Sequence, residues 1–289
     1  MTASAPHLTV LNSMAGTDFA DALDTHVEWG LRVLDLKNAI FGKPVMELTD
    51  REAERAAGMI AERGLTVHCL STGLFNEAVE AGEETFREEH LGRVDRAVEI
   101  GNALDARTVR LLAASTERRD EVLHSFLYLQ QEAPWLFDLY AAAVDRLGEE
   151  GFKVVIENEV GGCIFSRPCE VPAFFERLDR PAARLTWDVQ NLWQMGTFPT
   201  PEIYHELEPL IGMLHLKGGR SEVAGGLLKW RAYLEDSSYP VLPIVRAAVA
   251  GGACSAVCLN PPHGEDSPDY DWDYRRDIEF LRANVPELA

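Results

Sequence analysis

Four short apolar stretches of the sequence end on residue types that bind metal ions. They recur at intervals of 31, 27 and 45 residues, and their last residues are Glu157, Asp188, His215 and Asn260. Two carboxylates, an imidazole and an amide carbonyl suit a hard or borderline divalent cation. Any one of these residues alone could be a structural cap at the end of a strand. Their joint occurrence predicts a metal site, provided that the fold brings the four ends together.

The spacing of these stretches indicates which fold would do so. It is close to the roughly 31 residues per strand-plus-helix unit of a barrel in which about 250 residues form eight units. Apolar runs alternate with amphipathic stretches along the chain, as expected for a parallel sheet. The strands are expected at residues 8–12, 31–36, 65–70, 107–112, 152–157, 183–188, 211–216 and 255–260. We therefore predict one (β/α)8 TIM-barrel domain over residues 1–289, whose strands end at a single rim.

Several helices can be located between these strands. Thr49-Asp50-Arg51-Glu52 has the form of a capping box and predicts a helix that ends near Gly64. A helix over residues 83–101 should face the sheet with a stripe at intervals of four, formed by Phe86, His90, Val94 and Val98. We expect His90 to be packed or hydrogen-bonded there. Further helices are expected at 133–148 and 271–284, with Pro168 and Pro201 in first helical turns.

Composition and charge narrow the class of partner. The chain is 46% hydrophobic and 26% charged, which is typical of a globular protein. Its 27 Lys and Arg residues against 47 Asp and Glu give a net charge of -20, which repels polyphosphate and argues against nucleic acid. No run approaches the ~18 apolar residues of a membrane span, and residues 1–6 lack the segments of a signal peptide. We expect a cytoplasmic protein with no membrane partner.

The cysteines do not suggest a further site. There are five, an odd number without a CxxC pair, so neither a disulfide framework nor a thiolate zinc site is indicated. The longest irregular stretch, residues 217–237, follows the predicted seventh strand. That is where barrel enzymes place substrate loops, although an ordinary surface loop fits the sequence equally well.

The strand register supports an inward-facing site. Side chains alternate along a strand, so the residues two before the four candidates should also point into the barrel: Val155, Thr186, Met213 and Cys258. All four can pack in a barrel interior. If Glu157 and Asp188 shared that poorly hydrated site without a cation, one carboxylate would tend to take up a proton. A divalent ion would remove this cost.

The motifs around these residues resemble those of a known family. Residues 154–159, 187–191 and 215–220 look like the fifth-, sixth- and seventh-strand motifs of the xylose isomerase-like sugar phosphate isomerases and epimerases. The order of elements agrees over nearly the whole chain, while the specific motifs lie within residues 152–260. The resemblance implies a single barrel in which Glu, Asp, His and a second Glu hold one divalent ion that the sugar chelates. Mn2+ is the expected ion, with Mg2+, Zn2+ and Co2+ as alternatives.

Carried over by position, Glu157, Asp188 and His215 match the first three ligands of that family. The fourth departs from the pattern, because Asn260 stands where the family usually has Glu. Asn191 stands where many members have His, and Arg220 resembles an arginine that fixes a substrate hydroxyl or phosphate. An amide oxygen can still ligate a hard cation, so Asn260 is retained as a predicted ligand.

Asn260 changes the chemistry that can be expected. Two-base epimerisation uses one carboxylate on each face of the reacting carbon, and an amide is not a base at neutral pH. One-base reactions through an enediolate remain, namely isomerisation of a small sugar, polyol or keto-sugar, or elimination of water by a lyase. A ligand-binding barrel without catalysis is the alternative. The apurinic endonuclease branch is disfavoured, because it uses three metals and several more histidines, whereas only His215 matches a ligand position.

Other residues are candidates for proton transfer and substrate binding. Besides Glu157, His68 is the second catalytic candidate, because it would reach the rim from the end of the third strand. Arg110 would need a buried partner, for which Asp35 is a candidate. The predicted substrate-binding residues are Asn191, Trp193, Lys217, Arg220, Glu159 and His263, of which the last two could also serve as acid or base. By resemblance, a homo-oligomer is expected.

Overall fold

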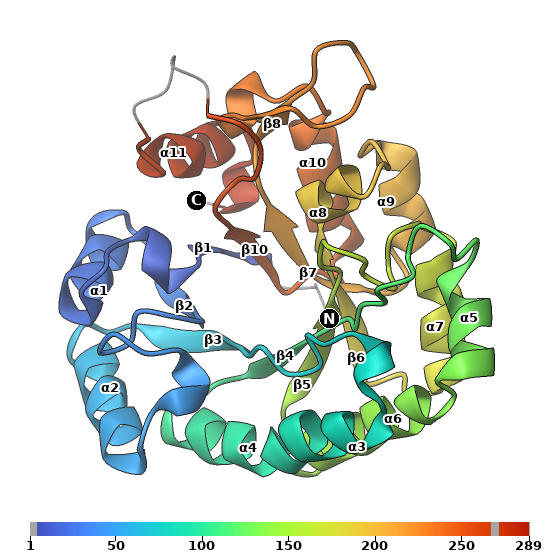
Figure 1. The fold of residues 1–289 in the computed structure, drawn as a ribbon. Helices are drawn as coiled ribbons and strands as arrows, with labels where there is room; N and C mark the ends of the chain where they lie inside the picture. Colours follow the sequence, from blue (N-terminus) through green and yellow to red (C-terminus); the bar gives the residue numbers. More distant parts are fainter. Residues whose placement is uncertain (1–4, 267–271, 289) are drawn as a thin grey trace.

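Eight parallel strands form a nearly closed barrel at the centre of the molecule (Figure 1). The computed structural model describes residues 5–266 and 272–288. The strands are β1 (His7–Val10), β2 (Val33–Leu36), β3 (Thr66–Ser71), β4 (Thr108–Leu112), β5 (Lys153–Glu157), β6 (Ala183–Asp188), β7 (Ile211–Leu216) and β10 (Ala256–Leu259). Each predicted strand is present, with ends within two residues of those expected. The predicted (β/α)8 TIM-barrel fold is confirmed.

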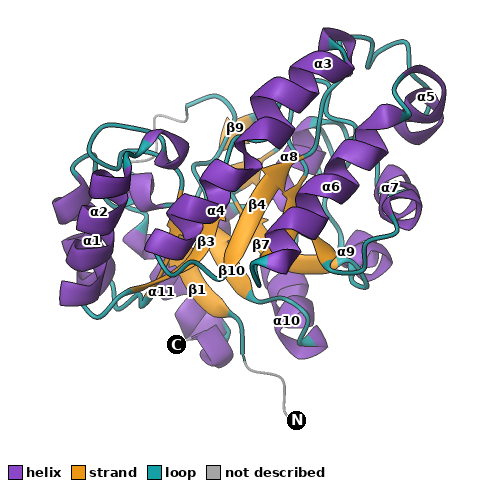
Figure 2. Cartoon of the chain, turned by 90° about the horizontal axis from the view of Figure 1, so that it is seen from below, coloured by secondary structure: helices purple, strands orange, loops and turns teal. Residues whose placement is uncertain are grey.

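Helices surround the barrel, and α4 and α6 lie across its outer face (Figure 2). They are α1 (Phe19–Glu28), α2 (Asp50–Glu62), α3 (Glu83–Thr85), α4 (Val94–Ala103), α5 (Ser125–Glu132), α6 (Trp135–Glu149), α7 (Glu170–Leu178), α8 (Val189–Gln194), α9 (Pro201–Leu207), α10 (Val241–Gly251) and α11 (Arg275–Asn284). A short antiparallel pair, β8 (Gly219–Arg220) and β9 (Trp230–Arg231), lies within the stretch predicted as irregular. No helix of the described residues is both long and apolar enough to span a membrane.

The predicted capping box of α2 and the predicted first-turn proline of α9 are both present. Thr49 caps α2 and exchanges hydrogen bonds with Glu52 as a complete capping box, and Pro201 is in the first turn of α9. Pro168 instead lies in a turn before α7, whose first residue is Glu170. The helix predicted from residue 271 begins at Arg275, and residue 271 itself lies outside the described residues.

The helix predicted over residues 83–101 is not continuous. A π-helical turn, Phe86–His90, and a 3-10 turn, Leu91–Arg93, separate α3 from α4. The predicted stripe of Phe86, His90, Val94 and Val98 is nevertheless buried. His90 accepts a hydrogen bond from the backbone N–H of Phe75 through Nδ1, at 3.0 Å, as expected of a packed histidine.

Side chains complete the closure between β1 and β2, which are the two ends of the sheet order. Thr9 donates from Oγ1 to the carbonyl of Val33 at 2.7 Å, and Leu11 forms an isolated bridge with Asp35. Asn12 then accepts from the backbone N–H of Lys37 at 2.9 Å. These contacts fix the end of β2, and therefore the start of the loop that carries Lys37.

The barrel interior is filled by side chains and is not an open pore. A small cluster of buried residues occupies it, formed by Leu11, Cys69, Val155, Met213, Ala256 and Cys258. The inward direction predicted for Val155, Met213 and Cys258 is therefore confirmed, and Thr186 is also fully buried. This apolar layer closes the barrel below the rim, so a ligand can only be bound above it.

Candidate metal centre and substrate cavity

The four predicted metal ligands stand at the carboxyl ends of four barrel strands. Glu157 ends β5, Asp188 ends β6, His215 is the second-last residue of β7, and Asn260 directly follows β10. All four are buried. The candidate donor atoms of Glu157, Asp188 and His215 lie within 4.8 Å of one another. The structure therefore brings the predicted carboxylates and imidazole to a shared point.

Each of the three groups has one atom facing that point, while the other end is held by the protein. Glu157 presents Oε1 at 2.7 Å from Nδ1 of His215, and its Oε2 pairs with the guanidinium of buried Arg110. Asp188 accepts hydrogen bonds at Oδ1 from the backbone N–H groups of Gln190 and Asn191, at 3.1 and 2.9 Å. Its Oδ2 makes no hydrogen bond within the described residues, but it forms an ion pair with Lys217. This arrangement, in which one atom faces the shared point and the other is anchored, fits a divalent ion well.

Asp188 is held by its place in the sequence as well as by its neighbours. It is both the last residue of β6 and the N-cap of α8, so the strand-to-helix transition fixes its carboxylate. Asn158 adds a reciprocal pair of hydrogen bonds with the Asp188 backbone, at 2.8 and 2.9 Å. Lys217 lies 2.8 Å from Asp188 Oδ2 as an ion pair and also donates to Asn191 Oδ1 at 2.7 Å.

His215 lies between two carboxylates. Its Nδ1 faces Glu157 and its Nε2 lies 3.5 Å from Oδ2 of Asp35. Burial alone would lower the pKa of His215, but Glu157 and Asp35 outweigh it and raise the pKa to about 9. Without an ion this imidazole is therefore protonated at neutral pH. Binding of a metal at Nδ1 would release one proton and leave Nε2–H directed at Asp35.

Arg110 has a different main partner from the one considered in the sequence. It pairs with Glu157 and donates to the carbonyl of Thr72 at 2.8 Å, whereas Asp35 accepts from Ser71. Burial raises the pKa of Glu157, but Arg110 and then His215 reverse this and hold it well below its usual range. Glu157 is thus kept ionised, which suits a ligand better than a base.

Asn260 is adjacent to the same point, although its amide nitrogen faces it. Its Nδ2 lies 2.7 Å from Nδ1 of His215, and its Oδ1 accepts a weak bond from Cys258 Sγ at 3.5 Å. Ligation through oxygen requires a half-turn of the amide group. Its role as the fourth ligand stays a prediction.

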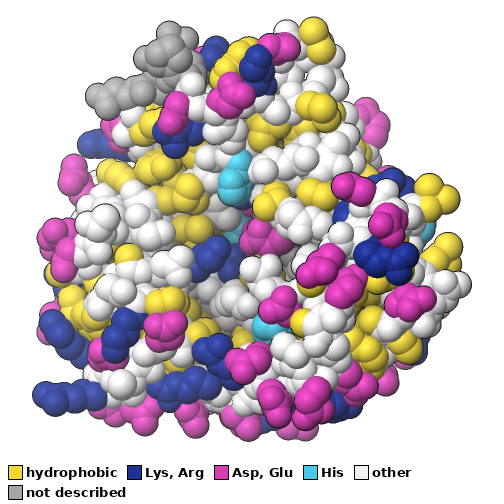
Figure 3. All heavy atoms as spheres, viewed as in Figure 1, with side chains coloured by type: hydrophobic (Ala, Val, Ile, Leu, Met, Phe, Trp, Pro, Cys, Tyr) yellow, Lys and Arg dark blue, Asp and Glu magenta, His cyan; other side chains and the backbone are white. Residues whose placement is uncertain are grey.

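A cavity of about 200 Å³, here called the rim cavity, opens above these groups. Predicted residues that line it are Glu157, Glu159, Lys217, Asn260 and His263, and they are joined by Lys37, Asn38 and Arg110. Figure 3 shows a hollow near the centre of this face, where basic, acidic and histidine side chains gather. The pocket is thus rich in cations although the protein as a whole carries a charge of -20.

His68 does not lie at this rim, and the prediction of a catalytic role there is corrected. Its Nε2 lies 3.1 Å from Ser255 Oγ, and its ring is 5.5 Å from that of His7, at the ends of β10 and β1 where those strands begin. The pairing of β2 with β3 skips His68, and β3 continues to Ser71. Ser71 therefore holds the rim position for which His68 was proposed.

Trp193, Asn191 and Arg220 are not among the described residues that line the rim cavity. Trp193 is buried, and its Nε1 donates to the carbonyl of Gly226 at 2.8 Å. Asn191 orients Lys217, while the Arg220 guanidinium lies 5.7 Å from the ring centre of Trp230. The predicted substrate contacts of these three residues remain untested, and their positions favour support of the loops.

One glutamine ties three rim loops together. Gln190, in α8 after β6, donates from Nε2 to the carbonyl of Gly218 after β7, at 2.7 Å. Its Oε1 accepts from the backbone N–H of His263 after β10, also at 2.7 Å. Sequence reasoning gave this residue no role, although it lies inside the 187–191 motif. Lys37 was missed as well, because its only signal was its position shortly after a strand end, which many surface residues share.

A family model described as xylose isomerase-like TIM barrel matches residues 26–283. The chain belongs to this family. No curated protein matches the chain. The TIM barrel in the description of the family agrees with the fold described above, and the motifs that suggested the resemblance lie inside the matched segment.

Solved structures agree on the fold at low sequence identity. A xylose isomerase-like TIM barrel protein from Mycobacterium smegmatis, in complex with magnesium, is 20% identical with a TM-score of 0.69, covering 99% of this chain and 98% of its own. The apo 3-keto-D-glucoside 4-epimerase YcjR from E. coli is 12% identical, with a TM-score of 0.71 and coverages of 96% and 99%. The probable 3-DHS dehydratase AsbF from Bacillus anthracis is 14% identical, with a TM-score of 0.70 and coverages of 97% and 99%.

Proposed function

We propose that this protein is a divalent-metal-dependent isomerase/epimerase-like enzyme that isomerises a small sugar, polyol or keto-sugar by one-base proton transfer through an enediolate. The observation that carries the proposal is the convergence of Glu157, Asp188 and His215, each with one atom directed at the shared point and the other held by the protein. The epimerase and magnesium-bound relatives support this class of reaction. A dehydratase on a related carbohydrate is the closest variant, since it needs the same groups, and one relative is named as such an enzyme.

Glu157, Asp188 and His215 would hold the ion, with Asn260 as the fourth ligand, and Mn2+ is the ion that we propose. When bound, the ion would polarise the substrate carbonyl and stabilise negative charge on its oxygen. The protein residues around it have separate tasks. Arg110 keeps Glu157 ionised, and Lys217 offers a cation to a substrate oxygen at the edge of the cavity.

Glu159 is the best placed group for the proton transfer. It lines the rim cavity two residues beyond Glu157. Burial and the neighbouring Glu157 raise its pKa, against the opposing effect of Arg110 and Lys217. A raised pKa makes the Glu159 carboxyl better able both to remove and to return a proton, whereas Glu157 is held ionised. We therefore propose that Glu159, rather than Glu157 or His68, is the base.

Metal content and deuterium exchange test the proposal together. We expect the purified protein to retain one divalent ion per chain, and the Mn2+-loaded protein to introduce deuterium beside the carbonyl of a ketose in D2O. Glu159→Gln should stop the exchange while the ion remains bound. Glu54→Gln, at an exposed carboxylate of α2 outside the rim cavity, is the control for lost charge. A protein that binds no divalent ion at neutral pH would refute the proposal.

A second candidate function, a ligand-binding barrel without catalysis, is favoured by one observation. Lys217 and Arg110 already place a cation beside each ligand carboxylate, so these two pairs are charge-compensated without an ion. This function predicts that carbohydrate binding is insensitive to a chelator. Binding that disappears with EDTA and returns with Mn2+ excludes it.

A further inference from the structure

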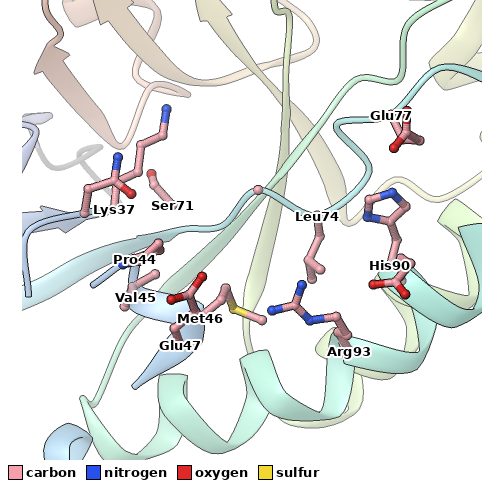
Figure 4. A pocket seen from close by; sticks show the side chains of 13 residues that line it. Lys37, Pro44, Val45, Met46, Glu47, Ser71, Leu74, Glu77, His90 and Arg93 are labelled. Carbon is pink, nitrogen blue, oxygen red and sulfur yellow. The ribbon is translucent and has the colours of Figure 1, made fainter. Parts of the chain in front are cut away.

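A second cavity adjoins the rim cavity and shares part of its wall. This side cavity has a volume of about 350 Å³ and lies between the loops after β2 and β3 and the segment that leads into α4. Lys37 and Asn38 line both cavities. Figure 4 shows Lys37 and Ser71 at one end of the side cavity and Glu77 and His90 at the other. The shared residues make the two cavities neighbouring compartments of one rim.

Lys37 is held at this junction with its ammonium group available. Its backbone N–H donates to Asn12 Oδ1 at 2.9 Å, and its carbonyl accepts from Val45 N–H at 2.8 Å. The side chain is half-buried and makes no hydrogen bond or ion pair with another described residue. A fixed backbone with an uncommitted cation is the arrangement expected where a ligand completes the contacts.

The side cavity contains further polar groups that the described residues leave without a hydrogen-bond partner. The guanidinium of Arg93, an exposed residue, projects into it and forms no hydrogen bond or ion pair with another described residue (Figure 4). His90 accepts at Nδ1 from Phe75, so its neutral ring carries hydrogen on Nε2, and this buried donor has no partner. A buried donor without a partner costs free energy, which an oxygen atom of a ligand would recover.

The chemistry of this wall selects a neutral hydroxylated group. Glu47, Glu77 and Glu89 line the cavity together with Lys37 and Arg93. The three carboxylates would repel an anion, and the lysine and arginine would repel a cation. A hydroxyl group can donate a hydrogen bond to a carboxylate and accept one from the lysine or arginine. The remaining wall includes an apolar strip, which suits the C–H face of a sugar ring and consists of Pro44, Val45, Met46 and Leu74.

We propose that the substrate has two units, of which the reacting one lies in the rim cavity and a neutral sugar ring lies in the side cavity. Lys37 contacts the substrate where the two units join. This inference rests on the proposed function, because the rim cavity must hold the reacting unit. It adds a binding site for the second unit, with Arg93 and His90 as its hydrogen-bond donors.

Matched pairs of sugars test this inference by calorimetry on the Mn2+-loaded full chain. D-fructose is compared with isomaltulose, which is fructose carrying a glucosyl group, and D-glucose with maltose. Two new hydrogen bonds, one from the charged Arg93 and one from neutral His90, predict that the two-unit sugar of at least one pair binds about tenfold more tightly or better. Arg93→Gln should bring the ratio of the two dissociation constants close to one. Arg51→Gln, at an exposed arginine of α2 outside both cavities, should leave the ratio unchanged.

The outcomes separate this inference from the proposed function. Equal affinities within both pairs, no binding of either two-unit sugar, or an undiminished ratio in Arg93→Gln would overturn the second site. The proposed function fails on different readouts, namely retention of the ion and deuterium exchange. A protein that keeps both but shows no preference for two-unit sugars retains its function and loses this inference.

Discussion

The ammonium group of Lys217 lies 2.8 Å from Oδ2 of Asp188, the oxygen that a bound ion would share. The other oxygen of Asp188 is occupied by backbone amides, so Lys217 and a metal ion compete for one carboxylate oxygen. The same lysine is held by Asn191 Oδ1. It can therefore swing away from Asp188 without losing every partner.

Replacement of Lys217 by Met should strengthen retention of the ion. Removal of a positive charge beside a dication relieves a repulsion of at least about 1.4 kcal/mol at the effective dielectric of a buried site, so we expect roughly tenfold tighter Mn2+ binding or better. Titration calorimetry of the metal-free protein measures this. Lys153→Met, at the start of β5, removes the same charge far from the rim and should have no effect.

Replacement of Asp35 by Asn should weaken binding of the ion. The carboxylate of Asp35 lies 3.5 Å from Nε2 of His215 and would hold the ring with Nδ1 toward the metal. Loss of such a supporting contact typically costs about 10–100-fold in metal affinity. The change should be read in the dissociation constant for Mn2+. If Asp35→Asn binds the ion as tightly as Asp24→Asn, an exposed control, Asp35 has no such orienting role.

Replacement of Glu157 by Gln should lower the free energy of unfolding as well as abolish ion binding. Arg110 is 1% exposed and would lose its charged partner, which for a buried pair typically costs about 3–5 kcal/mol. Urea denaturation measures this loss. The double variant Arg110→Met with Glu157→Gln should recover part of it, because no unpaired charge is then left in the core.

Asp277 predicts a pH dependence of stability that is separate from the metal site. Burial raises the pKa of this carboxyl, which accepts from the N–H of Leu234 at 2.8 Å, from 3.8 to about 7. The folded chain therefore binds the proton more tightly than the unfolded chain. The stabilising contribution of the protonated form is complete below pH 3.8 and is lost as the pH rises through 7. Asp277→Asn should raise the free energy of unfolding at pH 8 by roughly 1–3 kcal/mol, and by less at pH 5.

Replacement of Gly218, which lies just after β7, by Ala should disturb the packing of the rim loops. A Cβ atom there would lie 2.2 Å from the carbonyl oxygen of Ala232 and 2.6 Å from the carbonyl carbon of Tyr233. Because both neighbours are backbone, Gly218→Ala must displace the β9 segment, at a cost of about 1–3 kcal/mol. Hydrogen exchange of residues 229–233 should increase. Gly58→Ala, in open space within α2, should stabilise the protein by up to about 1 kcal/mol.

The strands were predictable because their signal is local. Apolar runs that alternate with amphipathic stretches placed every barrel strand, and Thr49 with Glu52 fixed the start of α2. The convergence of Glu157, Asp188 and His215 then followed from the barrel, since parallel strands end at one rim.

The remaining details depend on contacts between distant segments. His68 was misplaced because the bulge in β3 is set by its pairing with β2, which the sequence of one strand does not reveal. The choice of Glu157 rather than Asp35 as the partner of Arg110 depends on which strand lies beside β4. Lys37 was missed because a lysine after a strand is common and only the cavity around it distinguishes it.

The two hydrogen bonds of Gln190 affect how the loops around the rim cavity move. Since one side chain bridges the segments at Gly218 and His263, those segments are expected to fluctuate in concert rather than one after the other. Access to the rim cavity would then depend on one concerted opening of both segments, with a single rate. Replacement of Gln190 by a residue without this amide would uncouple the two segments from each other, although Gln190 itself contacts neither the ion nor the substrate.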